Sequence, residues 1–215
     1  MRSFQLTRRT GALALLALLA WPRLPAAGEE YATGNVRGRV RLEVEGTRVA
    51  DAGPLVAFLE PLGGAPAPPV PGAVPKVYQK DARFSPQFLA IAAGQSVAMP
   101  NDDAIYHNVF SYSTPNDFDL GLYPAGESRT VTFRHAGVVR TYCSIHESMS
   151  GTIFVAPTRY FAVMRPAGDF EIRDVAPGRY KLTTWCERLP SVTREIQVQP
   201  GKGATVDLVI GSAQR

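Results

Sequence analysis

The sequence predicts an all-β protein built from two β-sandwiches. Apolar and polar residues alternate along many short segments, as they do in strands with one buried face. Clusters rich in glycine, proline and asparagine separate these segments, and no long segment repeats apolar residues at helical spacing. Short, closely spaced strands joined by such turns are typical of sandwiches.

The first 27 residues are expected to form a secretory signal peptide. Three arginines precede the apolar run Gly11 to Trp21, and the small residues Ala26 and Ala27 follow it. The run of 11 residues is shorter than the roughly 20 that a membrane-spanning helix needs. We therefore expect no transmembrane span in the mature form, with an uncleaved anchor as the alternative.

The charge balance argues against a nucleic-acid partner. The chain has a formal net charge of +4, but four of its arginines lie in the first 27 residues, which contain no acidic residue. The rest of the chain has 19 basic and 19 acidic residues. Nucleic-acid-binding domains carry a clustered basic surface, so no nucleic acid is expected among the partners.

The first strands are expected soon after residue 34. Segment 36–44 alternates valine and leucine with arginine and glutamate, which predicts a half-buried strand. The segment Leu55 to Leu59 is apolar throughout, which predicts a strand buried on both faces. Residues 61–75 contain six prolines and three glycines. Because proline lacks the N–H that a sheet needs, we interpret residues 63–75 as a linker or exposed loop.

Two further groups of strands follow. Six strands are expected in segments 88–93, 96–99, 107–112, 129–134, 138–143 and 151–156, separated by turns such as PNDD, YPAGES and HAG. Five more are expected in segments 160–164, 168–175, 178–185, 194–199 and 204–210. This last group carries its own large apolar residues for a small core: Phe170, Ile172, Tyr180 and Trp185.

Rare side chains are concentrated in the segment TYCSIHESMSG. The chain has two cysteines, three histidines and four methionines, and one of each stands at Cys143, His146 and Met149, three residues apart. A fourth candidate, His107, lies in DDAIYHNVFS. Two imidazoles, one thiolate and a weak axial thioether are the donors of a type 1, or blue, copper site. A short loop between two strands could direct the first three residues toward one point, while His107 would come from a neighbouring strand.

Other interpretations of these residues stay open. Cys143 could form a disulfide with Cys186, His107 could be a core histidine, and Met149 could serve packing alone. Zinc is a weaker candidate than copper, because it prefers nitrogen, thiolate and oxygen ligands. We expect Cys186 to be a small buried residue and His135 to be an exposed turn residue.

The four residues, in this order, resemble the cupredoxins, the family of small blue copper proteins, and the C-x2-H-x2-M spacing is amicyanin-like. The segment FSPQFLAIAAGQSVAMPNDDAIYHNVFS is similar to the N-terminal half of that family. The resemblance implies a Greek-key cupredoxin sandwich over residues 76–157. It also implies one copper ion, cycling between Cu(I) and Cu(II), with His107, Cys143, His146 and Met149 as its ligands.

The same resemblance implies roles for neighbouring residues. Asn108 would contact Ser144 and direct its backbone N–H toward the ligand sulfur, which orients ligands and tunes the potential. The second histidine ligand would approach the surface through an apolar docking patch that includes Tyr106 and Ile145. The implied partners are redox proteins, one donating and one accepting an electron.

The C-terminal segment GDFEIRDVAPGRYKLTTW resembles the carboxypeptidase regulatory-like, or prealbumin-like, sandwich. Such modules usually begin with strands like VRGRVRLEV and LVAFL, which here precede the copper region. Our hypothesis is that the copper domain is inserted into a discontinuous domain of residues 34–62 and 158–212, which could bind carbohydrate or protein. The rival hypothesis is that the N-terminal strands extend the copper sandwich.

The numbers of histidines and cysteines argue against several classes of copper protein. Multicopper oxidases and copper nitrite reductases need more histidines than this chain has, and a dinuclear purple site needs two cysteines in the loop. We therefore expect an exported, periplasmic electron carrier with one type 1 copper, not an enzyme. The alternatives are copper carriage or storage, and a scaffold in which copper is structural.

Overall fold

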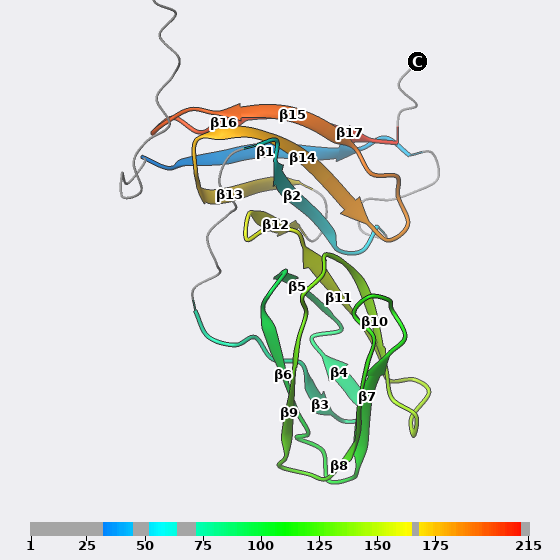
Figure 1. Cartoon of the computed structure of the whole chain (residues 1–215). Helices are drawn as coiled ribbons and strands as arrows, with labels where there is room; N and C mark the ends of the chain where they lie inside the picture. Colours follow the sequence, from blue (N-terminus) through cyan, green and yellow to red (C-terminus); the bar gives the residue numbers. More distant parts are fainter. Residues whose placement is uncertain (1–31, 45–51, 64–71, 165–167, 212–215) are drawn as a thin grey trace, which may run out of the picture. The chain divides into compact units, whose positions relative to one another are not determined.

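The computed structural model describes residues 32–44, 52–63, 72–164 and 168–211. Strands β1 to β17 run through this part of the chain, which contains no α-helix, so the all-β prediction is confirmed (Figure 1). No helix in these ranges is long and apolar enough to cross a membrane. The expected signal peptide and most of the linker lie outside the described residues.

The middle of the chain forms the first sandwich. Its main sheet has the order β5 (Phe88–Ala92), β11 (Ser150–Ala156), β10 (Gly137–Tyr142), β7 (His107–Ser111) and β8 (Phe118–Tyr123). The antiparallel pairs β6 (Ser96–Pro100) with β9 (Ser128–Thr132), and β3 (Tyr78–Lys80) with β4 (Arg83–Ser85), complete it. Side chains from both layers share one buried core, which includes Val97, Met99, Val109, Phe133, Val139 and Ile153.

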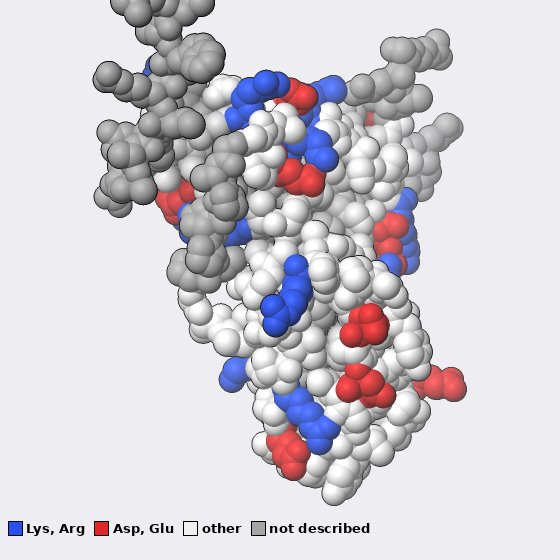
Figure 2. All heavy atoms as spheres, viewed as in Figure 1, with Lys and Arg blue, Asp and Glu red and all other residues white. Residues whose placement is uncertain are grey.

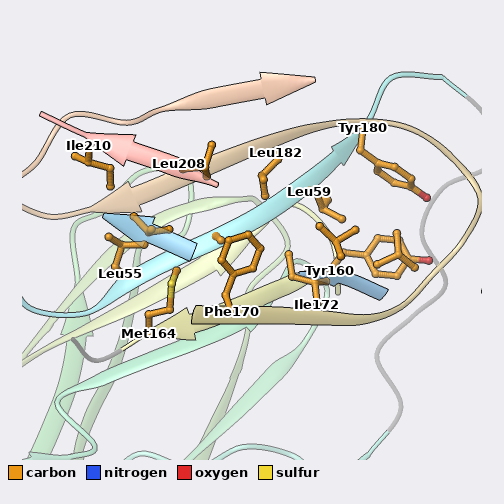
Figure 3. Close-up of a cluster of buried hydrophobic side chains, with 14 of the residues drawn as sticks. Leu55, Leu59, Tyr160, Met164, Phe170, Ile172, Tyr180, Leu182, Leu208 and Ile210 are labelled. Atoms are coloured by element: carbon orange, nitrogen blue, oxygen red, sulfur yellow. The ribbon is translucent and has the colours of Figure 1, made fainter. Parts of the chain in front are cut away.

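The remaining strands form the second sandwich. One layer consists of β13 (Asp169–Val175), β1 (Gly34–Leu42), β16 (Ala204–Thr205) and β17 (Leu208–Ile210). The other has the order β12 (Phe161–Met164), β2 (Leu55–Pro61), β14 (Gly178–Cys186) and β15 (Thr193–Val198). Their facing side chains fill a core that includes Leu55, Leu59, Phe170, Ile172 and Leu182 (Figure 3).

The burial of β1 and β2 follows their sequence patterns. Val36 and Val40 of β1 are buried, whereas its arginines face solvent. Two of them form ion pairs with β13, Arg37 with Glu171 and Arg39 with Asp169, both at 2.6 Å. Such exposed pairs contribute little stability. On the face seen in Figure 2, basic and acidic side chains lie next to one another. Strand β2 is buried on both faces, as predicted.

The close pairing of β1 and β13 depends on a glycine. Gly38 lies opposite Phe170, and a Cβ at Gly38 would collide with the carbonyl oxygen of Val206 and lie 2.8 Å from the Phe170 ring. Only glycine therefore allows β1 to approach its neighbours this closely.

Among the described residues, β1 and β2 pair only with strands between residues 161 and 210. A third buried cluster joins the five-stranded sheet of the first sandwich to the β12–β2–β14–β15 sheet of the second. The ring centroid of Phe154 in β11 lies 5.6 Å from that of Phe58 and 4.8 Å from that of Trp185. An ion pair between Arg140 and Glu187 lies at 2.6 Å. The ring contacts bury Phe154 on the β5–β11–β10–β7–β8 sheet.

Three details differ from the sequence-based expectations. Segment 204–210, predicted as one strand, forms the two short strands β16 and β17. The break between them places Asp207 so that its carboxylate accepts a hydrogen bond from the backbone N–H of Arg39. Strand β8 and the hairpin β3–β4 were not predicted, because β3 and β4 have only three residues each and β8 contains a glycine, which weakens the signal of a strand.

Tyr180, in the core of the second sandwich, should make the stability of the protein depend on pH. Burial raises the pKa of Tyr180 to about 12, and its hydroxyl donates a hydrogen bond to the carbonyl of Ala176. Above pH 10 the unfolded chain loses this proton while the folded chain retains it, so stability falls as pH rises from about 10 toward 12. Tyr180→Phe should weaken this fall by up to about 2–3 kcal/mol.

Urea unfolding at pH 9 and pH 11 measures about half of this difference, because pH 11 lies only one unit above the pKa of the unfolded chain. Tyr123 has a similarly raised pKa, so part of the fall should remain in the variant. The control is Tyr112→Phe, because Tyr112 is 83% exposed. An unchanged pH dependence in Tyr180→Phe would contradict the prediction.

Candidate metal centre

The candidate centre lies where β7 begins and β10 ends. His107 is the first residue of β7 and is fully buried, and Cys143 directly follows β10 and is 5% exposed. The Nδ1 atom of His107 lies 3.8 Å from the Sγ atom of Cys143. The two residues are therefore close in space although 36 positions separate them in the sequence.

The loop of residues 143–149 brings the third donor to this point. Tyr142 of β10 pairs with Ser150 of β11, so both ends of the loop are fixed to the sheet. Inside the loop, the N–H of Cys143 donates to the carbonyl of Met149 at 3.3 Å, and the N–H of Met149 donates to the carbonyl of His146 at 2.9 Å. These bonds tie the three predicted ligands of the loop to one another.

Gly151 allows the loop to close tightly. It lies opposite Thr141 in the ladder, and a Cβ at this position would lie 2.9 Å from the Thr141 hydroxyl oxygen and 3.3 Å from the carbonyl oxygen of Gln87. A larger residue would therefore push β11 away from its neighbours next to the ligand loop.

Three of the four predicted ligands form one cluster. One ligand atom each from His107, Cys143 and His146 lies within 4.8 Å of the others, and among the described residues no other group of three or more potential ligands is this close. The imidazole rings of His107 and His146 meet edge to face, with centroids 4.9 Å apart. The Nδ1 atom of His146 is buried and has no hydrogen-bond partner. An unpaired buried nitrogen is costly, and a bound metal would satisfy it.

Met149 lies in the same core as Cys143 and is 1% exposed. This burial is compatible with Met149 as a thioether ligand and equally with a role in packing alone. The set of one thiolate, two imidazoles and one thioether is soft, which suits copper better than zinc. The residues present therefore fit a copper ion.

The loop is also tied to β7. The side-chain oxygen of Asn108 accepts hydrogen bonds from the backbone N–H of Ser144 at 2.8 Å and from its hydroxyl at 2.9 Å. This contact holds the residue after Cys143 against the residue after His107. The effect of the contact on a bound metal stays a prediction.

Apolar side chains are exposed near the cluster. Tyr106, which precedes His107, is 57% exposed, and Ile145, which precedes His146, is 47% exposed. Ile105 is exposed to a similar degree. Exposed large apolar residues next to a site are typical of a contact surface, and their role in docking stays a prediction.

Asp103 is a site residue that the sequence analysis did not identify. Its Oδ2 atom lies 2.8 Å from Nε2 of His107, on the side of the ring away from Cys143. A hydrogen bond from the N–H of Ala82 lowers the pKa of Asp103, and the bond with His107 lowers it further. The only signal in the sequence is an acidic residue four positions before the histidine.

Cys186 and His135, which were not predicted as ligands, do not belong to the cluster. Cys143 and Cys186 are both free, which contradicts a disulfide between them. Cys186 is buried in the core of the second sandwich, where its thiol donates to the carbonyl of Ala52 at 3.0 Å. His135 is exposed, as expected for a turn residue.

No model of a known protein family matches the chain, and no curated protein matches its sequence. A purple cupredoxin from Nitrosopumilus maritimus is 24% identical, covering 38% of this chain and 99% of its own, with a TM-score of 0.35. A reduced mutant of amicyanin is 19% identical, covering 46% of this chain and 98% of its own, with a TM-score of 0.37.

A copper-containing nitrite reductase from Thermus scotoductus SA-01 is 25% identical, with a TM-score of 0.38. The matched region covers 45% of this chain but only 25% of the reductase, so the chain spans about a quarter of that enzyme. Because all these TM-scores are low, the interpretation of the centre rests on the side chains described above.

Proposed function

We propose that this protein is an exported carrier of single electrons that binds one copper ion through His107, Cys143, His146 and Met149. The observation that carries the proposal is the cluster of two imidazoles and one thiol, whose ligand atoms lie within 4.8 Å of one another; His107 and Cys143 are buried and His146 is partly buried. The unpaired Nδ1 atom of His146 supports it, because that atom needs a partner.

When bound, copper would supply a one-electron couple between Cu(I) and Cu(II). The chain would provide ligands acceptable to both states: soft sulfur from Cys143 and Met149, and imidazole nitrogen from the two histidines. The buried position of His107 and Cys143 would exclude water, and the loop bonds would keep the donors in place. A site that changes little between oxidation states favours electron transfer over catalysis.

The partners would be two redox proteins that dock on the apolar residues Ile105, Tyr106 and Ile145. These side chains flank the two histidines in the sequence and are about half exposed. Weak redox encounters use small interfaces, so a small patch is sufficient. Residues 1–27 would direct export to the periplasm and be removed.

The proposal includes the division into domains. Residues 76–157 would be the copper domain, inserted into a prealbumin-like domain of residues 34–62 and 158–212. The pairing of β1 and β2 with strands from the C-terminal segment supports this division. The prealbumin-like part would bind carbohydrate or another protein.

Titration of the purified protein with Cu(II) tests the function. The expected result is an intense visible absorption that saturates at one equivalent of copper and disappears when a reductant is added. A protein that remains colourless and holds only Cu(I) would favour copper carriage or storage. A protein that binds no copper in either oxidation state would refute the proposal.

The axial position offers a further prediction. Met149→Leu should retain copper and its visible absorption but raise the reduction potential, because the weak axial donor is lost. The exchange conserves volume and should cost less than about 1.5 kcal/mol of stability. Protein-film voltammetry measures the potential, and Met99→Leu is the control, since Met99 is fully buried in the same core. Equal potentials in both variants would contradict an axial role for Met149.

A further inference from the structure

The hydrogen bonds around Nε2 of His107 have no role in the function proposed above. The ring of His107 is fully buried, and its Nε2 atom lies 2.8 Å from Oδ2 of Asp103. An ionised carboxylate can only accept hydrogen bonds, so the contact requires a proton on Nε2. In a neutral imidazole the other nitrogen then carries the lone pair, and Nδ1 faces the sulfur of Cys143 at 3.8 Å.

Asp103 is itself held by the hairpin β3–β4. The N–H of Ala82 donates to the same oxygen of Asp103 at 2.8 Å. Asp81 and Ala82, the two turn residues, have φ values of 51° and 49°. Residues other than glycine adopt this left-handed conformation at an energetic cost. The strained turn therefore presents its N–H to the carboxylate next to the ligand histidine.

A buried amide holds the other end of this loop. Asn101 is fully buried, and its side-chain oxygen accepts a hydrogen bond from the N–H of Asp103 at 3.1 Å. Its side-chain nitrogen donates to the carbonyls of Ile105 at 2.8 Å and Tyr123 at 3.1 Å. The loop from residue 101 to residue 107 thus has its backbone bonded on both sides of Asp103, which limits the movement of that carboxylate.

We propose that Asp103 is a positioning residue that keeps His107 in the Nε2–H tautomer and turns its Nδ1 lone pair toward the metal position. This inference rests on the proposed copper function for its consequence, but the tautomer itself needs no metal. Ligand histidines in proteins commonly donate their second N–H to such a partner, and loss of the partner weakens metal binding by about 10–100-fold.

The first test measures the tautomer in the metal-free, full-length protein. Long-range proton–nitrogen correlation spectra of the ¹⁵N-labelled chain distinguish Nδ1–H from Nε2–H, and the His107 signals are assigned by their absence in His107→Gln. We expect the Nε2–H form in the wild type and in Asp103→Asn, whose amide oxygen still accepts. Asp103→Ala should show a mixture of tautomers. A wild type with the proton on Nδ1 would overturn the proposal.

The second test measures copper binding and potential. Asp103→Ala should bind copper about 10–100-fold more weakly. Asp103→Asn should bind more nearly like the wild type but with a raised reduction potential, because a negative charge that favours Cu(II) is gone. Asp102→Asn is the matched control: it removes a neighbouring exposed carboxylate and should change neither quantity.

The outcomes separate the two proposals. A wild type that binds no copper but holds His107 as Nε2–H would refute the copper function and leave the role of Asp103 intact. If Asp103→Ala does not fold, the tautomer of His107 in the wild type decides the question, because that measurement needs no substitution of Asp103. A proton on Nδ1 of His107 in that protein would overturn the positioning role, whatever the potential of Asp103→Asn.

Discussion

A Cys143→Ser protein is expected to lose the intense visible absorption of the copper-loaded wild type. This absorption requires a copper–thiolate bond, and serine provides no thiolate. Copper affinity should fall by more than the roughly 10–100-fold that loss of an outer hydrogen-bond partner causes, because a direct donor is removed. Spectroscopic titration with Cu(II) measures both effects.

Cys186→Ser is the matched control for this experiment. Cys186 is also buried and free, but it lies in the core of the second sandwich. Its substitution should leave the visible absorption and the copper stoichiometry unchanged. If the absorption survives in Cys143→Ser and disappears in Cys186→Ser, the assignment of the ligand thiol is wrong.

Among the substitutions proposed for this protein, Phe154→Ala is expected to cause the largest loss of stability. Phe154 is 4% exposed and contacts Phe58 and Trp185 in the cluster that joins the two main sheets. Truncation of such a buried aromatic side chain typically costs about 3–5 kcal/mol. Urea unfolding of the metal-free protein measures the loss. The copper spectrum should not change, because Phe154 belongs to a different cluster from the ligands.

Phe110→Ala controls for the removal of an aromatic ring from the same sheet. Phe110 of β7 is only half-buried, and its ring contacts are Tyr112 and Tyr142. It should lose clearly less stability than Phe154→Ala. Equal losses would mean that the cluster between the sheets contributes nothing beyond ordinary ring burial.

Local patterns explain which strands could be predicted. The alternation of residues 36–42 and the apolar segment 55–59 describe one-sided and two-sided burial, and both segments are buried in that way. Strand β8 gives a weaker signal: apolar residues alternate with Asp119 and Gly121, but Gly121 has a φ of 63° and Leu122 is exposed. It exists as a strand because β7 provides a partner for its backbone groups.

The hairpin β3–β4 was missed for a similar reason. Its turn has neither glycine nor asparagine at Asp81 and Ala82, although both adopt a left-handed conformation. Local propensity therefore argues against the turn. Its connection to the rest of the fold, which includes the hydrogen bond from Ala82 to Asp103, is visible only in three dimensions.

The sequence by itself determined the class of the fold and the chemical character of the candidate centre. Alternation of side chains encodes strands, and the spacing of Cys143, His146 and Met149 encodes a short loop with soft donors. Only the tertiary structure decided which distant groups complete it. Sheet pairing places His107 beside Cys143, and hydrogen bonds of the loop place Asp103 next to Nε2 of His107. Such contacts depend on the register of strands far apart in the chain, which no local pattern specifies.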